Sequence, residues 1–175
     1  MGVGLNDWIG LLPGIGQKYQ IDPALLRAII MVESSGNEYA ARHEKGWKWL
    51  DRVLFFARAV FFTQDTEEMF QKTSWGLMQV MGSVAREHGF VGPLNKLHQP
   101  SLGIDIGAKH LAKFLLKYKD ITAAVASYNA GSPVVDIATG RYKNAEYVAK
   151  VMGYYKSFGG VYERVPFILP KSEIR

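Results

Sequence analysis

Glu33 has the residue type and the sequence setting of a general acid. Asp22 and Pro23 form a helix start signal, because aspartate accepts hydrogen bonds from the first free amides and proline fits the first helical turn. The expected helix runs from Pro23 to about Glu33 and ends at Ser34-Ser35-Gly36-Asn37. Glu33 continues the apolar stripe of this helix near its C-terminus, so desolvation and the helix dipole are both expected to raise the pKa of its carboxyl group. A carboxyl group that keeps its proton can protonate a poor leaving group, as cleavage of a glycosidic bond requires. Position alone also fits a glutamate that simply faces solvent at a fraying helix end.

A second group of candidate residues lies in the segment Ser74-Trp75-Gly76-Leu77-Met78-Gln79-Val80. Gly76 permits a close approach of backbone to a sugar, and the Gln79 amide offers donors and acceptors for acetamido and hydroxyl groups. Met78 can pack softly against a sugar ring. The alternative for Met78 is a place in the hydrophobic core, where large apolar side chains are usually found.

The remaining candidates lie in two segments of the C-terminal half. Tyr128 and Asn129 are at the end of a predicted helix, directly before the turn residues Gly131-Ser132-Pro133, where polar groups can be directed into a cleft. The segment Asn144-Ala145-Glu146-Tyr147-Val148 contains Glu146, which is expected to accept buried hydrogen bonds and so hold the cleft together.

In this order along the chain, these segments resemble the motifs of the soluble lytic transglycosylase (SLT) family, which is related to goose-type lysozymes. The opening motif resembles Ile21-Asp22-Pro23 through Glu33-Ser34, and the whole resemblance covers residues 21 to about 155. It implies a mainly α, lysozyme-like fold with Glu33 as the catalytic residue. It also implies a set of substrate-binding residues, which are Ser34, Ser74, Gly76, Met78, Gln79, Tyr128, Asn129, Glu146 and Tyr147.

The resemblance further implies a reaction, the cleavage of the β-1,4 bond between N-acetylmuramic acid and N-acetylglucosamine in peptidoglycan. Glu33 is expected to donate a proton to the bridging oxygen. It is then expected to remove the proton of the muramoyl C6 hydroxyl, which attacks C1 and forms a 1,6-anhydro product. The 2-acetamido group of the substrate stabilises the cationic intermediate, so no carboxylate nucleophile is needed.

Two alternatives to this reaction stay open. In the first, Asp51 acts as a second carboxylate that activates water, and the enzyme is a hydrolase like the goose-type lysozymes. In the second, the chain binds glycans without catalysis.

The interval between Glu33 and Gly76 is longer than in the common soluble enzymes of this family and is expected to be an inserted cleft wall or lid. Within it, Trp47 to Phe62 is apolar nearly all round a helical wheel. A buried core helix is the first interpretation, and aromatic contacts to sugar rings or lipid are the second. No period-two series predicts a strand. Helical patterns are expected at Trp8–Tyr19, Lys45–Phe62, Gly76–His88, Ser101–Tyr118, Ile121–Tyr128 and Ala145–Phe158.

Length and composition limit the other possibilities. A chain of 175 residues with 48% apolar residues fits one domain over residues 1–175, ending in an extended surface tail at 159–175. The absence of cysteine and the unpaired spacing of the four histidines predict neither a metal nor another cofactor. No apolar stretch approaches the about 20 residues of a membrane-spanning helix, and no basic residue of a signal peptide precedes Lys18.

The size of the chain and the missing signal peptide resemble those of phage or prophage endolysins. Such enzymes stay in the host cytoplasm until they are released to the periplasm and cell wall, and the same localisation is expected here. We expect a monomer.

A formal net charge of +5 favours a polyanionic partner. Lys109, Lys113 and Lys117 recur at every fourth residue and therefore form one stripe along a helix. This stripe fits a solvated helix face as well as contact with the anionic bacterial envelope. Nucleic acid is not expected as a partner, because no helix-turn-helix, RNA-binding or zinc-finger signature accompanies the charge. The expected partners are the glycan strands of peptidoglycan.

Overall fold

The computed structural model describes residues 7–162 and is mainly helical over this range, as expected. The helices are η1 (Asp7–Leu11), α1 (Leu12–Tyr19), α2 (Pro23–Ser34), α3 (Val53–Val60), α4 (Gln64–Gln71), α5 (Gly82–Glu87), η2 (Leu94–His98), α6 (Pro100–Tyr118), α7 (Ile121–Ala130) and α8 (Ala145–Ser157), where η marks a 3-10 helix. One antiparallel sheet has the order β1 (Ala41–His43), β2 (Thr73–Trp75) and β3 (Val80–Met81), and a hairpin joins β4 (Val135–Asp136) to β5 (Arg141–Tyr142).

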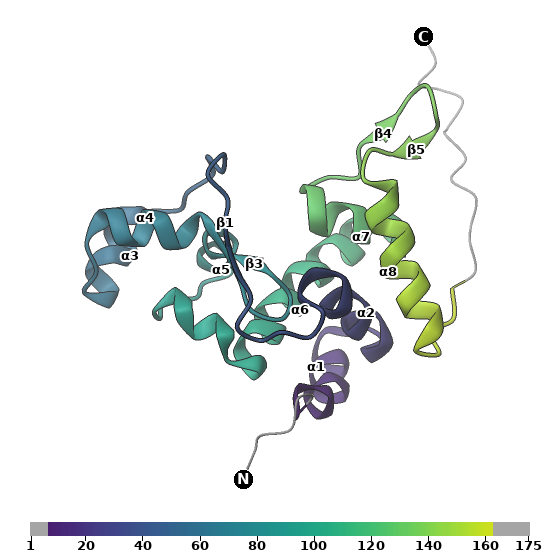
Figure 1. The fold of residues 1–175 in the computed structure, drawn as a ribbon, viewed down its shortest axis with the longest axis horizontal. Coiled ribbons are helices and arrows are strands. Elements are labelled where there is room, and N and C mark those ends of the chain that lie inside the picture. Colours follow the sequence, from purple (N-terminus) through teal and green to yellow (C-terminus); the bar gives the residue numbers. More distant parts are fainter. Residues whose placement is uncertain (1–6, 163–175) are drawn as a thin grey trace.

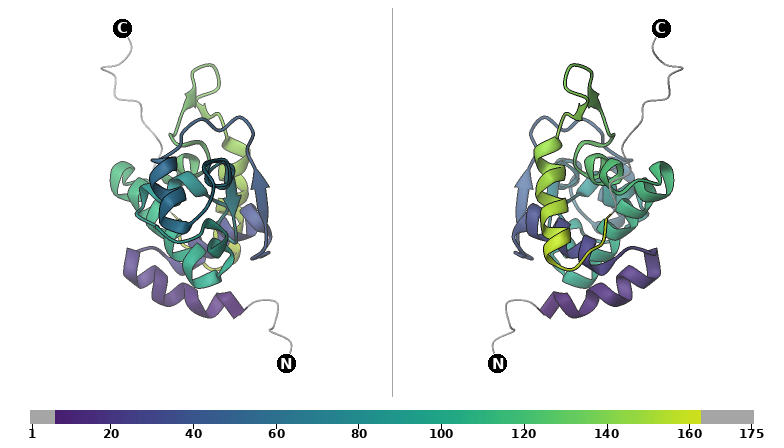
Figure 2. Two further views of the ribbon diagram at one scale, coloured as in Figure 1. Left: turned by 90° about the vertical axis from the view of Figure 1, so that its left-hand side faces the viewer. Right: turned by 90° about the vertical axis from the view of Figure 1, so that its right-hand side faces the viewer.

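Helices α2 and α6 form the middle of the molecule (Figure 1). α2 packs against α8, and α6 packs against α7, so one continuous hydrophobic core connects the N-terminal and C-terminal helices. Helices α3 and α4 lie together at one end of the long axis, while α8 and the β4–β5 hairpin lie at the opposite end. Figure 2 looks onto these two ends in turn.

Helix α2 begins and ends as its sequence predicts. The Asp22 side chain accepts a hydrogen bond from the amide of Ala24 at 2.8 Å, and Pro23 occupies the first turn. Ser35 terminates the helix in a left-handed conformation with φ of 54°. The helix is anchored by a buried face, which consists of Leu25, Leu26, Ala28, Ile29 and Ile30.

The predicted helices at Ser101–Tyr118, Ile121–Tyr128 and Ala145–Phe158 are confirmed by α6, α7 and α8 with small changes at their ends. The sequence pattern predicted no strand, but residues 7–162 contain five short ones. Each strand has only two or three residues, which is too short to show a period-two pattern, and β1 pairs with β2 from a segment about 30 residues away.

The predicted helix at Lys45–Phe62 is confirmed only over Val53–Val60. Tertiary hydrogen bonds hold the residues before α3 in an irregular path. The indole nitrogen of Trp47 donates to the carbonyl of Trp49 at 2.7 Å and lies 2.8 Å from the Ser83 hydroxyl. The backbone of Asp51 exchanges two 2.7 Å hydrogen bonds with the side-chain amide of Gln71.

The interpretation of this segment as a buried core helix was also wrong. Phe56 and Ala57 are only 1% and 2% exposed, but their neighbours Leu54 and Phe55 are 50% and 56% exposed. A short helix at the end of the molecule has only one face covered by the protein, so the apolar residues on its other faces stay in solvent.

The predicted helix at Gly76–His88 begins only at Gly82. Residues 76–79 form a turn and are followed by β3. Gly76 and Gln79 have φ of 69° and 46°, values that a right-handed helix cannot accommodate. A Cβ atom at position 76 would lie 2.4 Å from the carbonyl oxygen of Leu97. The glycine therefore permits a close approach to the protein's own backbone, which corrects the expected approach to a sugar.

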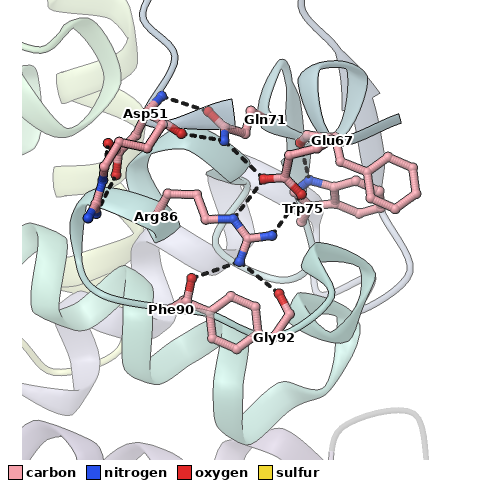
Figure 3. A network of polar contacts seen from close by, with 9 residues as sticks. Asp51, Glu67, Gln71, Trp75, Arg86, Phe90 and Gly92 are labelled. Carbon is pink, nitrogen blue, oxygen red and sulfur yellow. Dashed lines mark hydrogen bonds and ion pairs between the residues drawn. The ribbon is translucent and has the colours of Figure 1, made fainter. Parts of the chain in front are cut away.

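A buried ion pair joins α4 to α5 (Figure 3). Arg86 and Glu67 are both fully buried, and two guanidinium nitrogens of Arg86 donate to the two carboxylate oxygens at 2.8 and 2.9 Å. Arg86 also donates to the carbonyls of Phe90 and Gly92, and Gln71 donates to Glu67 at 2.9 Å. Every group of the pair thus has a partner, as burial of charge requires. The network connects the segment between β1 and β2 to the helices that follow it.

Two further expectations concern the C-terminal tail and membrane-spanning helices. Most of the predicted tail at 159–175 lies outside the described residues. Between residues 7 and 162, no helix has both the length and the apolar character needed to cross a membrane.

Candidate active site

Glu33 lies in the last turn of α2, and a contact to the turn at 76–79 fixes this helix end. The hydroxyl of Ser34 donates to the carbonyl oxygen of Leu77 at 2.8 Å and contacts that of Ile30 at 3.2 Å. Ser34 was predicted to bind substrate, but its hydroxyl is occupied within the protein. Its role in the structure is to hold the end of α2, and therefore Glu33, against the turn.

The carboxyl group of Glu33 has one direct polar partner among the contacts of the described residues. The hydroxyl of Tyr147, on α8, donates to its Oε1 atom at 2.6 Å. Burial raises the pKa of Glu33, whereas the Tyr147 hydrogen bond and the positive charge of Arg42 act in the opposite direction. The net pKa shift is upward, as the sequence predicted. The pKa of Tyr147 is itself strongly raised, mainly by burial, so its hydroxyl keeps the proton that it donates.

Tyr128 lies next to this carboxyl group but bonds elsewhere. Its hydroxyl donates to the backbone carbonyl of Met78 at 2.8 Å, and its ring centre lies 5.5 Å from that of His110. Burial raises the pKa of Tyr128 well above its usual range, and the negative charge of Glu33 adds to this. The tyrosine thus joins α7 to the turn at 76–79 and forms part of the wall beside Glu33.

The Gln79 side chain bonds mainly to the protein. Its amide nitrogen donates to the carbonyls of Ala40 and Gly76 at 3.0 and 2.9 Å, and its oxygen accepts from the Ser74 hydroxyl at 3.0 Å. The expected donors for sugar groups are therefore already occupied. These bonds tie the loop before β1 to β2 and to the turn, since a backbone with positive φ needs such support.

Two further predictions are corrected. Met78 is 0% exposed and belongs to the core, because its side chain packs against Gly107 on α6. The alternative of an ordinary core residue was the right one. Glu146 is exposed in the first turn of α8, and its side chain accepts no buried hydrogen bond from residues 7–162. The neighbouring residue Tyr147 points to the interior and makes the contact to Glu33.

A cleft of about 690 Å³ opens beside Glu33. Five of the predicted site residues line it, namely Glu33, Ser74, Gln79, Tyr128 and Asn129. The others, Ser34, Gly76, Met78, Glu146 and Tyr147, lie outside its lining. The cleft also has lining residues that the motifs did not include: Arg42, Glu44, Trp47, Trp49, Glu87, His110, Lys113 and Lys117.

The inserted segment and α6 supply the additional walls of the cleft. Trp47 and Trp49 stack edge to face with 5.0 Å between ring centres, and both line the cleft, as expected for an inserted wall. From α6, Lys113 and Lys117 line the cleft, whereas Lys109 donates to the carbonyl of His88. The lysine stripe is exposed to solvent, and part of it also forms a wall of the site. Its spacing in the sequence was the signal that pointed to it.

Asp51, the alternative second carboxylate, does not line the cleft. Both of its side-chain oxygens accept from the guanidinium of Arg52, at 2.9 and 3.1 Å. Glu44 lines the cleft but is paired with Arg42. Among residues 7–162, no group of three or more histidine, cysteine, aspartate or glutamate side chains is arranged to bind a metal ion.

Behind Tyr128, two histidines form a neutral pair. His88 Nε2 lies 3.0 Å from His110 Nδ1, a contact that needs one nitrogen to donate and the other to accept. Burial lowers the pKa of His88 to about 4 and that of His110 to about 3, and positive charges nearby, including Lys113, add to this. Neither ring is therefore protonated at neutral pH.

The histidine pair predicts loss of stability in acid. Because the pKa values of both rings are lower in the fold than the ordinary value of 6.5, unfolded chains take up protons first as the pH falls. Stability present above pH 6.5 should be lost as the pH decreases toward about 3. In His110→Phe this dependence should be weaker than in the wild type. Thermal unfolding midpoints measured from pH 7.5 down to pH 4 test it, and parallel curves for the two proteins would contradict it.

The fold and the site together define a lysozyme-like helical domain with a desolvated glutamate in its cleft. The chain belongs to the Transglycosylase SLT domain family, whose model matches residues 12–150. It is also similar to the membrane-bound lytic murein transglycosylase E of Buchnera aphidicola subsp. Acyrthosiphon pisum (strain APS). The two are 28% identical over 142 residues, which cover 73% of this chain and 52% of the relative. The chain thus spans about half the length of that protein.

Proposed function

We propose that this chain is a lytic transglycosylase that cleaves the β-1,4 bond between N-acetylmuramic acid and N-acetylglucosamine in peptidoglycan. The observation that carries the proposal is the Glu33 carboxyl group, which lines a cleft, is desolvated and receives a hydrogen bond from Tyr147. Family membership and the similarity to a lytic murein transglycosylase support the choice of substrate.

In the proposed mechanism Glu33 acts twice. Its carboxyl group first protonates the bridging oxygen as the glycosidic bond breaks. The resulting carboxylate then removes the proton of the muramoyl C6 hydroxyl, whose oxygen attacks C1 and closes the 1,6-anhydro ring. The 2-acetamido group of the substrate stabilises the cationic intermediate between the steps. Tyr147 orients the carboxyl group and stabilises its charged form after proton donation.

Two features of the cleft fit a mechanism that uses one carboxyl group. Asp51, the candidate for water activation, is bound to Arg52 and lies outside the cleft lining. Tyr128 and the aromatic wall of Trp47 and Trp49 supply apolar surface that favours exclusion of water from the reacting atoms.

The test is digestion of purified murein sacculi followed by mass spectrometry of the soluble products. Anhydromuramoyl products are expected, 18 mass units lighter than those of a hydrolase because no water is added. Muramic acid at a reducing end would instead support the hydrolase alternative. Sacculi that release no fragments, although the protein binds to them, would support a glycan-binding module without catalysis.

Tyr147→Phe is expected to move the alkaline limb of the pH profile. The tyrosine hydrogen bond lowers the pKa of Glu33, so its removal should raise that pKa and keep the acid protonated to higher pH. The carboxyl group also loses its orienting partner, so kcat should fall by up to about 100-fold. The profile of kcat/KM against pH, measured on sacculi, checks both effects. An unchanged alkaline limb would contradict the assigned role.

A further inference from the structure

Helix α3 has an exposed apolar face that the proposed reaction does not use. Leu54 and Phe55, in the first turn of α3, are 50% and 56% exposed, and Phe61, the C-cap residue, is 97% exposed. We call these three residues, together with Arg58, the α3 face. The opposite side of the helix is anchored, because Phe56 is buried and its ring lies 4.4 Å from the Arg86 guanidinium. Through Phe56 the helix is therefore anchored to Arg86 of the buried network in Figure 3, with the α3 face on its solvent-exposed side. An exposed apolar patch of this kind marks a contact surface.

The charges around the α3 face are mostly positive. The helix itself contains no acidic residue, and Arg58 is exposed and outside the ion pairs of the described residues. Over residues 45–62 the sequence has four basic residues and one acidic residue, Asp51. Arg52 both neutralises Asp51 and lies 5.4 Å from the ring of Phe55. Asp65 is the exposed acidic residue that follows, at the start of α4. Aromatic side chains interleaved with arginine complement a surface that is apolar below an anionic layer.

The α3 face also has a suitable position and length. Helix α3 lies at one end of the long axis, far from α8 and the β4–β5 hairpin (Figures 1 and 2). Its eight residues span about 12 Å, which is sufficient to lie in a membrane interface and too short to cross a bilayer. Because the residues of the α3 face are not among those that line the cleft, docking through it leaves Glu33 accessible to glycan.

We propose that the α3 face docks this protein on the surface of an anionic phospholipid bilayer. Phe55 and Phe61 enter the boundary between headgroups and acyl chains, and Arg58 pairs with lipid phosphates. The positive charge favours this occupant over a second copy of the chain, whose own α3 face would bring arginines against arginines.

Cosedimentation of the full chain with vesicles tests the proposal. Binding is expected to vesicles that contain phosphatidylglycerol and to weaken in high salt, with much weaker binding to vesicles of phosphatidylcholine alone. Phe55→Ser with Phe61→Ser should lower the partition coefficient by about tenfold or more. Arg58→Gln should lower it by a smaller factor. Matched controls are Ile137→Ser and Arg141→Gln, which alter exposed residues of the hairpin at the other end and should bind as the wild type does.

Several results would overturn the proposal. These are equal binding to neutral and anionic vesicles, no binding to either, or equal losses in the hairpin controls. Self-association in analytical ultracentrifugation that is lost in Phe55→Ser with Phe61→Ser, without lipid binding, would assign the face to a second copy. Digestion of free sacculi should be unchanged in this variant, so failure of lipid docking is distinguishable from failure of the proposed catalysis.

Discussion

Glu33→Gln is expected to lower kcat on murein sacculi by about 10³-fold or more, because one positioned acid or base alone contributes about 10² to 10⁴. The same carboxyl group is proposed to act in both steps, and an amide can neither donate the first proton nor accept the second. The substitution conserves the shape of the side chain, and the amide oxygen can still accept from Tyr147. The fold and glycan binding should therefore persist while turnover is lost.

The measurement for Glu33→Gln is the initial rate at which anhydromuramoyl fragments appear, with binding to sacculi and thermal unfolding recorded alongside. Glu146→Gln is the matched control, since it makes the same chemical change at an exposed glutamate outside the cleft lining and should retain wild-type turnover. If Glu33→Gln kept activity within tenfold of the wild type, Glu33 would not be the acid, and the proposed mechanism would be wrong.

Arg86→Met is expected to destabilise the fold by about 3–5 kcal/mol, because it leaves a buried carboxylate without its cation. Glu67 and Arg86 are both 0% exposed, and the guanidinium also holds the carbonyls of Phe90 and Gly92 (Figure 3). This loss is a large part of the total stability of a domain of this size. Because the same network anchors the segment that carries Trp47 and Trp49, activity should decline together with stability.

Urea denaturation gives the free energy of unfolding for this test. Lys72→Met is the comparison, since it breaks a partly exposed pair with Glu68 and should change stability by at most about 1 kcal/mol. Removing both buried charges, in Arg86→Met with Glu67→Leu, should be less harmful than removing the arginine alone. A single Arg86→Met variant as stable as the wild type would show that the pair contributes nothing to the fold.

Part of the candidate site could be predicted from local sequence signals. The start at Asp22-Pro23 and the breakers after Glu33 place α2 correctly, because capping and termination depend on the nearest few residues. The upward shift in the pKa of Glu33 could also be predicted, since the apolar stripe of α2 already implied desolvation. The spacing of Lys113 and Lys117 in the sequence predicted a lysine stripe on one helix, but it did not predict that these two lysines line the cleft.

Other features could be seen only in the tertiary structure. The hydrogen bond from Tyr147 to Glu33 joins residues 114 positions apart, and no spacing rule relates such partners. The motif residue Gln79 seemed available to substrate but bonds to Ala40, Gly76 and Ser74, because the turn brings these groups together. The segment before α3 is not helical, because Ser83 and Gln71 hold it through hydrogen bonds to Trp47 and Asp51. Local helix propensity does not predict such contacts between distant segments.

The sequence by itself determined the helical class and the ends of α2, since these depend on patterns within one or two turns. The resemblance of its motifs to a known family, and not the position of one glutamate, singled out Glu33 as the proposed acid. The tertiary structure decided the partner of that acid, the walls of its cleft and the exposure of the α3 face. The physical reason is that desolvation, ion pairing and burial depend on all neighbours in space, and those neighbours come from distant parts of the chain.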